Sequence, residues 1–480
     1  MLIIALLFVR LLQLFSYSID LDGAEFTFVH YIQQLLNGQP LYMNPEAHPY
    51  SAVIYAPLNL YMVYGICKLF SVDQIQDIHT IFIVGRVVSF VSVLCCLFCV
   101  DKFIIKHTSD YPIRAKCLLF FLLIMTGHAY AFRPDSMKIL FFLWFLYYFI
   151  EYVYYTQKIT HLCLSILFAN LSFLSKQDIL FYVLLFEMVV LIYHRNLKTI
   201  TAFVATIVSF GITVFLLRLL FGKYTWISLF LFNLQQISNA EWSYNMIVVV
   251  FNTARLLPIY CFLIYYLYSV RNDKHEIFKK VIITSGLLSC VASTFFLFRP
   301  GSYLNYTYEA ISLLMFGLLL VVLQQQYSST KRKMILVYFI LFFVTALYKN
   351  YVISFEKEKN YAKDFKAYYE MRNQILPFVN HNETLFVPDL KLSVFLADKN
   401  IVYGHEYHLG RLIYANFKLQ STSQLKTISS KVYDDNFVNG KIDYLLAINK
   451  PTEIEVIETY YPKYILQQKL NNFLLYKFKQ

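Results

Sequence analysis

Three carboxylates follow the first apolar run of the chain within six residues: Asp20, Asp22 and Glu25. Asp22 and Glu25 are three residues apart, so if Asp22 caps the helix predicted to follow, both lie on nearly one side of its first turn. In that position one carboxylate can act as a general base and the other as its partner. A helix cap with solvated acids at a membrane exit is the alternative that the pattern leaves open.

Basic residues stand beside acids in two later segments. Arg133, Asp135 and Lys138 occur within six residues, with a proline that restricts the turn between them. Snorkelling explains a single cation at the end of an apolar run, but this set is larger. Lys176 and Gln177 lie between two closely spaced apolar runs. Both segments are therefore predicted to hold their charges near a bilayer surface.

Two more positions extend this polar set. Arg299, Tyr303 and Asn305 precede an apolar run, and Glu309 lies about one turn inside it. A carboxylate within a membrane segment is costly and is a candidate site residue for that reason. Arg86 lies near the start of another apolar run. The predicted partners of Glu309 are Arg299, Lys176 and Arg133.

These residue types suit the displacement of a lipid phosphate from a sugar. Arginine and lysine can neutralise a phosphate or diphosphate, the first with a planar fork and the second as a point charge. They would stabilise the charge that develops on the leaving phosphate, while an acid activates the attacking hydroxyl or amine. The sequence shows residue types on one predicted face and does not show that they meet.

The elements that must position these residues are predicted to be membrane-spanning helices. The chain is 58% hydrophobic and 15% charged, whereas soluble domains carry about 25% charged residues. The first apolar run, 1–17, lacks the basic leader and small-residue cleavage site of a secretory signal. About eleven crossings are expected. After the first, they are predicted at 83–100, 117–132, 139–155, 162–175, 179–193, 199–221, 245–269, 281–298, 306–323 and 334–349.

The basic residues give the predicted orientation. The net charge is +12, and most of the excess lies in alternate short loops, which assigns those loops and the N-terminus to the cytoplasm. Nucleic acid is therefore not a predicted partner. The same alternation would be inverted if the apolar stretch 52–70 crossed the membrane, so it is predicted to lie on the outer face. The pair Cys96 and Cys99 lies inside an apolar run, and no metal site is predicted.

The C-terminal region, 350–480, changes to a composition typical of a small α/β domain outside the membrane. Its apolar runs predict strands at Thr384–Val387, Ser393–Leu396, Tyr444–Ile448 and Phe473–Phe478, and the charged segment 360–372 predicts a helix. The predicted organisation is a membrane domain, 1–349, with an outer loop and juxtamembrane helices at 18–80, followed by this outer domain.

Several short motifs occur in the order of a known superfamily. They are Asp22-Gly-Ala-Glu25, Asn37-Gly-Gln-Pro-Leu-Tyr42, Tyr55-Ala-Pro-Leu58, Gly85-Arg86, Arg133-Pro-Asp135, Ser175-Lys-Gln177 and Asn305-Tyr-Thr-Tyr-Glu309. Together they resemble the GT-C superfamily of glycosyltransferases that use polyprenyl-phosphate sugars. The branch is that of protein O-mannosyltransferases and aminoarabinose transferases of lipid A. The resemblance covers about the first two thirds of the chain.

The resemblance implies roles for individual residues. Asp22 is the expected catalytic base, Asp20 its rival, and Glu25 a partner or an acceptor-binding residue. The expected donor-phosphate contacts are Arg86, Arg133, Lys138, Lys176 and Arg299, with Asp135, Gln177, Tyr55, Tyr303, Asn305 and Glu309 as further site residues.

The partners follow from the same resemblance. A polyprenyl-phosphate sugar is the expected donor, and a glycan or lipid is the expected acceptor. A protein acceptor is disfavoured because the outer loops lack the extended blocks of protein O-mannosyltransferases. No cofactor is required, although the acid cluster could bind a divalent cation. The compact chain favours a bacterial inner (plasma) membrane protein, with the C-terminal domain outside.

Two other function classes remain open. A flippase or transporter of a lipid-linked sugar would show polar residues through the depth of the bilayer and repeated halves, which the sequence lacks. A polysaccharide polymerase would use diphosphate-linked oligosaccharides. A membrane scaffold without catalytic activity is the remaining alternative.

Overall fold

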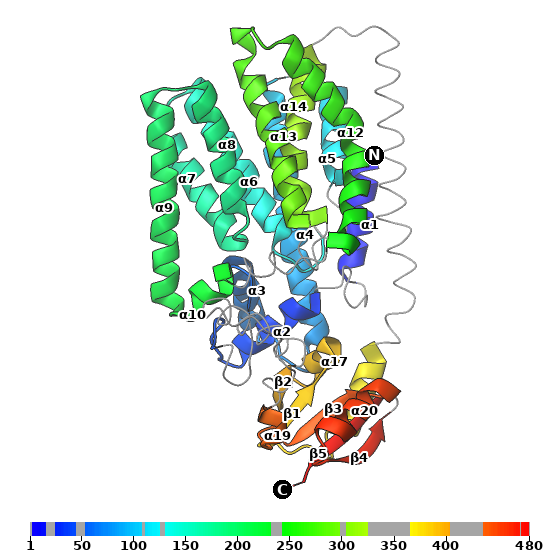
Figure 1. The fold of residues 1–480 in the computed structure, drawn as a ribbon. Helices are drawn as coiled ribbons and strands as arrows, with labels where there is room; N and C mark the ends of the chain where they lie inside the picture. Colours follow the sequence, from blue (N-terminus) through cyan, green and yellow to red (C-terminus); the bar gives the residue numbers. More distant parts are fainter. Residues whose placement is uncertain are drawn as a thin grey trace.

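The computed structural model describes residues 2–15, 25–44, 53–107, 111–124, 130–231, 242–297, 304–324, 365–403, 435–470 and 472–479. All structural statements below concern these residues. The predicted apolar runs within them form a bundle of helices (Figure 1). These are α1 (Leu2–Leu14), α4 (Ile78–Ile105), α5 (Tyr111–Ile124), α6 (Asp135–Ile150), α7 (Ile159–Ser175), α8 (Ile179–Tyr193), α9 (Leu197–Phe221), α12 (Trp242–Ser269), α13 (Ile277–Leu297) and α14 (Tyr308–Gln324).

Four helical segments are long and apolar enough to cross a membrane by length and composition: Ile78–Ile105, Asp135–Tyr155, Leu197–Phe221 and Ile277–Leu297. The second of these includes the π-helix η2 (Glu151–Tyr155), which continues α6. The last predicted crossing, 334–349, lies outside the described residues. The prediction of a helical membrane protein is confirmed, and the number of eleven crossings stays a prediction.

One predicted crossing ends earlier than expected. The run 117–132 was predicted as one span, but α5 ends at Ile124, and residues 130–134 form a turn before α6. Pro134 precedes the first residue of α6 and disfavours helix in the residue before it, so Arg133 lies in the turn and α6 begins at Asp135. The predicted charged segment therefore begins a helix instead of ending one.

Short helices cover one end of the bundle (Figure 1): α2 (Glu25–Leu36), α3 (Pro57–Leu69), α10 (Tyr224–Trp226) and the π-helix η3 (Ile227–Leu231). With 13 residues, α3 is about 20 Å long and too short for roughly 30 Å of hydrocarbon. This length agrees with the prediction that 52–70 does not cross. We call this end of the bundle the outer end, following the predicted orientation.

The basic loops predicted to be cytoplasmic gather at the opposite end. Arg114 in the first turn of α5 pairs with Asp101 near the end of α4 at 2.8 Å, and Lys106 pairs with Glu151. Nearby, the ring of Tyr154 lies 4.9 Å from the rings of both His194 and Phe278. The loops that follow α4, α6 and α8 therefore share one end with the start of α13.

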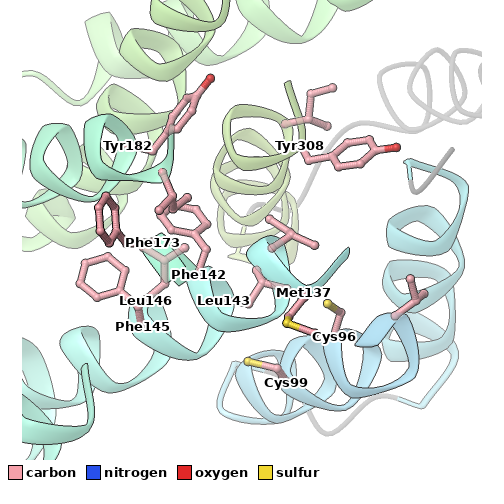
Figure 2. Close-up of a cluster of buried hydrophobic side chains, with 14 of the residues drawn as sticks. Cys96, Cys99, Met137, Phe142, Leu143, Phe145, Leu146, Phe173, Tyr182 and Tyr308 are labelled. Carbon is pink, nitrogen blue, oxygen red and sulfur yellow. The ribbon is translucent and has the colours of Figure 1, made fainter. Parts of the chain in front are cut away.

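Helix α6 lies at the centre of the bundle and packs against α4 and α7. Its side chains Phe142, Phe145 and Leu146 are buried beside Phe173 of α7, and Met137 lies beside Cys96 of α4 (Figure 2). Cys96 and Cys99 are free and buried, as their place in an apolar run predicts. Because α6 is so tightly surrounded, its first turn is held in a fixed position at the outer end.

The C-terminal domain holds a five-stranded sheet of order β2-β1-β3-β5-β4. The strands are β1 (Thr384–Val387), β2 (Asn400–Tyr403), β3 (Tyr444–Ile448), β4 (Tyr464–Leu470) and β5 (Phe473–Phe478). The first three are parallel; β5 pairs antiparallel with β3, and β4 pairs antiparallel with β5 at the edge. Helical residues 365–375 and α17 (Leu390–Phe395) cover one face, and α19 (Asp435–Val438) and α20 (Pro451–Tyr460) cover the other. The predicted small α/β domain is confirmed.

The predicted strands fit this sheet in three cases and fail in one. The segments predicted at β1, β3 and β5 have the predicted bounds. The predicted strand Ser393–Leu396 is wrong because these residues lie in or directly after α17. The Asp389 side chain caps that helix by accepting from the backbone N–H of Lys391 and Leu392. Edge strand β4 was missed because its middle residues are exposed and polar.

The outer domain lies directly on the first-loop helix (Figure 1). The Gln33 amide of α2 donates to the backbone oxygen of Val394 at 2.8 Å. Asn37 donates to the oxygen of Ala397 at 3.3 Å, and the Tyr369 hydroxyl donates to that of Ile75 at 2.9 Å. The first loop and the C-terminal domain therefore occupy the same end of the bundle, as the charge pattern predicts.

A two-pronged ion pair within the outer domain predicts a pH dependence. Arg372 donates to both oxygens of Asp398, at 2.6 and 2.9 Å. Burial raises the pKa of Asp398, but the hydrogen bonds and charge of Arg372 outweigh it, and the net pKa is below its usual value. The pair therefore stabilises the domain above the unfolded pKa of about 3.9, and this is lost as pH falls through the lower folded pKa.

Hydrogen–deuterium exchange of peptides from 365–403 in the full chain measures this effect. At neutral pH, Asp398→Asn should exchange faster than wild type. The two should converge as pH falls through the lowered folded-state pKa of Asp398, because the carboxylate is then protonated in both states. Glu370→Gln, which removes an exposed pair with Lys366 at 3.8 Å, is the control and should match wild type throughout. An Asp398→Asn difference that persists unchanged at low pH would contradict the assignment.

Candidate functional site

Six charged side chains from four helices meet at the outer end of the bundle. We call them the charged cluster: Arg133, Asp135, Lys138, Lys176, Asp178 and Glu309. They come from the turn before α6 and its first turn, from the turn between α7 and α8, and from the start of α14. Each position is the outer end of a helix, which is why segments far apart in sequence converge here.

Asp135 forms one half of the charged cluster. Its Oδ1 accepts from the Lys176 ammonium at 2.8 Å, and its Oδ2 lies 3.3 Å from Nε of Arg133. Asp135 is the first residue of α6, and its side chain is fully buried. Two cations predicted to contact a donor phosphate are therefore brought together by one carboxylate.

Lys138 forms the other half. Its ammonium lies 3.0 Å from Asp178 and 2.8 Å from Glu309, and it is fully buried. Lys176 is 3.9 Å from Asp178, which connects the two halves. Lys176 and Arg133 were predicted as partners of Glu309. That prediction was wrong, because both contact Asp135 instead. Lys138 lies in the first turn of α6 and Glu309 in the first turn of α14, and these two helix starts meet.

Tyrosines enclose the lysines. The ring of Tyr306 lies 4.0 Å from the Lys176 ammonium and 5.9 Å from that of Lys138, within the range of cation–π attraction. The Tyr182 hydroxyl donates to the backbone oxygen of Tyr306 at 2.8 Å and lies 3.0 Å from the Ser293 hydroxyl. These contacts hold the segment before α14 over the charged cluster.

The charged cluster has equal numbers of positive and negative groups, and its side chains are buried. It contains three cations and three acids, and each side chain is exposed by less than a tenth. Buried charges persist when they are paired, and they lose much of their stability when one partner is removed. A phosphate that enters would have to share the cations with Asp135 or Asp178. The arrangement can thus hold a phosphate at its rim and supply positive charge as the phosphate leaves.

A separate ion pair fixes the start of α2. Arg86 of α4 donates to both oxygens of Glu25, at 2.9 and 2.7 Å. The backbone N–H of Phe132 also donates to Glu25, at 2.6 Å. Both charged side chains are fully buried or nearly so. Glu25 and Arg86 are thus brought together, but with each other and not with the charged cluster. The pair joins the end of the acidic loop to the segment that carries Arg133.

Gly85 allows this junction to close. A Cβ at position 85 would lie 2.1 Å from the Phe132 ring, so only glycine fits against it. We expect Gly85→Ala to destabilise the protein by about 1–3 kcal/mol, the usual cost of overpacking. Thermal unfolding in detergent measures it. Gly65→Ala in α3, where a Cβ meets nothing within 4 Å, is the control. If Phe132→Leu does not reduce the cost of Gly85→Ala, the proposed steric cause is wrong.

Three of the other predicted site residues lie in the described part of the chain, and four lie outside it. Gln177 donates to the backbone oxygen of Ile54 at 2.7 Å, so it links the charged cluster to the segment before α3. Tyr55 is half-buried, with its ring 4.7 Å from that of Phe28. Asn305 lies in the 3-10 helix η5 (Leu304–Thr307). Four residues lie outside the described residues: Asp20, Asp22, Arg299 and Tyr303.

Sequence reasoning missed three contributors. Asp178 was visible beside Gln177 but was not assigned a role, although an acid between two apolar runs is a signal. Tyr306 stood within a quoted motif without a role of its own. Tyr182 and its partner Ser293 gave no signal, because a hydroxyl in an apolar run most often bonds locally. Among the described residues, no group of three or more His, Cys, Asp or Glu is placed to hold a metal ion.

Comparisons with known proteins identify the fold. No protein-family model matches the sequence, and no curated protein matches it either. The structure is similar to two solved structures of ArnT from Cupriavidus metallidurans. For the one bound to undecaprenyl phosphate, the TM-score is 0.58 at 11% identity over 99% of this chain and 97% of that one. For the apo state, the TM-score is 0.60 at 10% identity over 98% and 97%. The fold resemblance predicted from the sequence is confirmed.

Proposed function

We propose that this protein is an integral membrane glycosyltransferase that uses a polyprenyl-phosphate sugar. The observation that carries the proposal is the similarity of nearly the whole chain to ArnT, whose solved structure holds undecaprenyl phosphate. The charged cluster adds independent support. It collects three cations at the outer end of the bundle, where α2 begins after the first acidic segment of the chain. The products would be a glycosylated acceptor and free polyprenyl phosphate.

In the proposed reaction, the bond between the anomeric carbon and the donor phosphate oxygen breaks. A new bond forms from that carbon to an acceptor hydroxyl or amine, whose proton passes to a carboxylate. Asp22 is the proposed base, with Asp20 as the alternative. Glu25 and Arg86 serve as positioning residues, since their ion pair fixes the end of the acidic loop. This role replaces the direct acceptor and phosphate contacts that the resemblance implied for them.

Arg133 and Lys176 are the proposed phosphate contacts. They share Asp135, so each can turn part of its hydrogen-bonding capacity toward an entering phosphate. Their positive charge would stabilise the phosphate as it leaves. Lys138 is fully enclosed by Asp178 and Glu309. Its proposed role is to position Lys176 and Arg133 rather than to touch the donor. Arg299 remains a proposed phosphate contact and Tyr303 a proposed site residue, as the resemblance implies.

The proposed setting is a bacterial inner membrane, with the outer domain and acidic loop outside. The donor tail lies in the bilayer, and the acceptor is a glycan or a lipid at the surface. The C-terminal domain lies on α2 through Gln33 and Asn37, so it would border the path of the acceptor.

A transfer assay in membranes tests the proposal. Membranes with and without the protein are given polyprenyl-phosphate sugar labelled in the sugar, together with envelope lipids and glycans. Label should appear in a new glycolipid or glycan only where the protein is present. Lys176→Gln should raise the KM for the donor, since it removes one phosphate contact. Rates are given per amount of protein, so that a change in expression does not enter the comparison. If labelled product forms equally without the protein, or never forms, the proposed activity is wrong.

A further inference from the structure

A groove of about 230 Å³ lies between α9 and the short turn that follows it. The turn exists because Gly222 ends α9 with a φ of +83°, which glycine adopts without strain. The chain then folds back, and α10 and η3 pack along the last turns of α9. The groove is lined by Gly211, Val214, Phe215, Leu217, Arg218, Thr225, Trp226, Leu229 and Phe230.

The polar groups of the groove lie at its outer end. Arg218 is exposed and forms no ion pair with any described residue, and Lys223 is exposed five residues later. The Thr225 side chain is 97% buried and lines the groove, yet its hydroxyl has no hydrogen-bond partner among the described residues. A buried hydroxyl without a partner is costly, so a ligand of the groove that reaches it would gain a hydrogen bond.

The groove lies on the membrane-facing side of the bundle. Most of α9 is apolar and exposed, as expected of a helix against lipid. Trp226 is half exposed at the outer end, where tryptophan is typical of a membrane interface. The walls are apolar, and the cations stand where lipid phosphates lie. An elongated apolar ligand with one anionic group fits this arrangement.

The groove is separate from the charged cluster. Helix α7 packs against α6 on one side and α9 on the other (Figure 1). Phe173 of α7 lies against Phe230 of the groove, with ring centres 6.4 Å apart. Lys176, one turn further along α7, belongs to the charged cluster. A donor lipid must reach that cluster, so the groove is available for another lipid.

We propose that this groove binds one anionic glycerophospholipid of the outer leaflet. An acyl chain lies along Val214, Leu217 and Leu229, and the phosphodiester accepts hydrogen bonds from Arg218 and the Thr225 hydroxyl. The bound lipid holds the turn of α10 and η3 against α9. The inference goes beyond the proposed transfer reaction and does not depend on it.

Native mass spectrometry of the purified full chain tests the site. The protein is mixed with phosphatidylglycerol or with phosphatidylcholine of the same acyl chains. Wild type should retain phosphatidylglycerol preferentially. Arg218→Gln should weaken this retention about fivefold, the equivalent of the roughly 1 kcal/mol that a basic residue contributes at an anionic surface. Arg195→Gln, an exposed arginine at the opposite end of α9, is the matched control and should behave as wild type.

A second variant fills the groove without touching its charges. A Cβ at Gly211 meets nothing within 4 Å, so Gly211→Leu should project into the groove and displace the lipid while thermal unfolding stays unchanged or improves. Equal retention by wild type, Arg218→Gln and Gly211→Leu would overturn the proposal. A competition experiment gives a second contradicting outcome. If polyprenyl phosphate displaces phosphatidylglycerol from wild type but not from Arg218→Gln, the groove is a site for the donor and the proposal is wrong.

Discussion

Replacing Asp22 with asparagine is expected to lower the rate of sugar transfer by about 10²–10⁴-fold, the usual contribution of a general base. The loss should appear in kcat, because asparagine keeps the size of the side chain but cannot take the acceptor proton. The fold should be retained, since the buried ion pair of Glu25 and Arg86 anchors the start of α2. Product formation per molecule of detergent-purified protein is the measurement.

Asp20→Asn is the matched control for this loss. It removes an equal charge from the same loop, so an electrostatic effect of the loop as a whole would affect both variants alike. A loss confined to Asp20→Asn would move the base to that residue. Full activity in both variants would eliminate first-loop acid–base catalysis.

Breaking the Glu25–Arg86 pair is expected to give the largest loss of stability in the protein. Removing one partner of a buried pair costs about 3–5 kcal/mol, because the other charge stays buried without compensation. Arg86→Met should therefore lower the free energy of unfolding in mixed micelles by this amount. The donor KM of the fraction that remains folded should stay near the wild-type value, because Arg86 is assigned no donor contact.

The double variant separates a structural from a catalytic role. In Glu25→Gln/Arg86→Met both charges are absent, while the glutamine oxygen can still accept from the Phe132 N–H. Stability should recover by more than half of the loss. If Arg86→Met instead keeps wild-type stability and raises the donor KM tenfold, Arg86 contacts the phosphate, as the resemblance first implied.

The helices could be predicted because they depend on local composition. Long apolar runs indicated where helices form, the orientation stays a prediction, and the length of α3 agrees with the charge alternation. The end of α5 at Ile124 was not predicted because hydrophobicity continues through Phe132, which is buried against Gly85 rather than facing lipid. Strand Ser393–Leu396 failed because a side-chain cap at Asp389 decided the local structure in favour of helix.

The candidate site could be predicted as a set of residues but not as a set of pairs. Sequence order indicated that Arg133, Lys176 and Glu309 share one end of the bundle. It could not show that Lys138 lies closer to Glu309 than they do, because that depends on how α6 and α14 are rotated about their axes. The enclosure of the lysines by Tyr306 and Tyr182 depends on the same helix packing. The spacing of residues along the sequence does not indicate it.

The most direct test of the proposed activity is a doubly labelled single-turnover experiment. Purified protein in liposomes receives a polyprenyl-phosphate sugar with one label in the sugar and another in the phosphate, together with an acceptor extract. The proposal predicts that free polyprenyl phosphate and a new glycosidic product appear together in a one-to-one ratio, and that Asp22→Asn abolishes both. If the intact donor crosses the bilayer with no bond broken, the protein is a transporter and the account is contradicted.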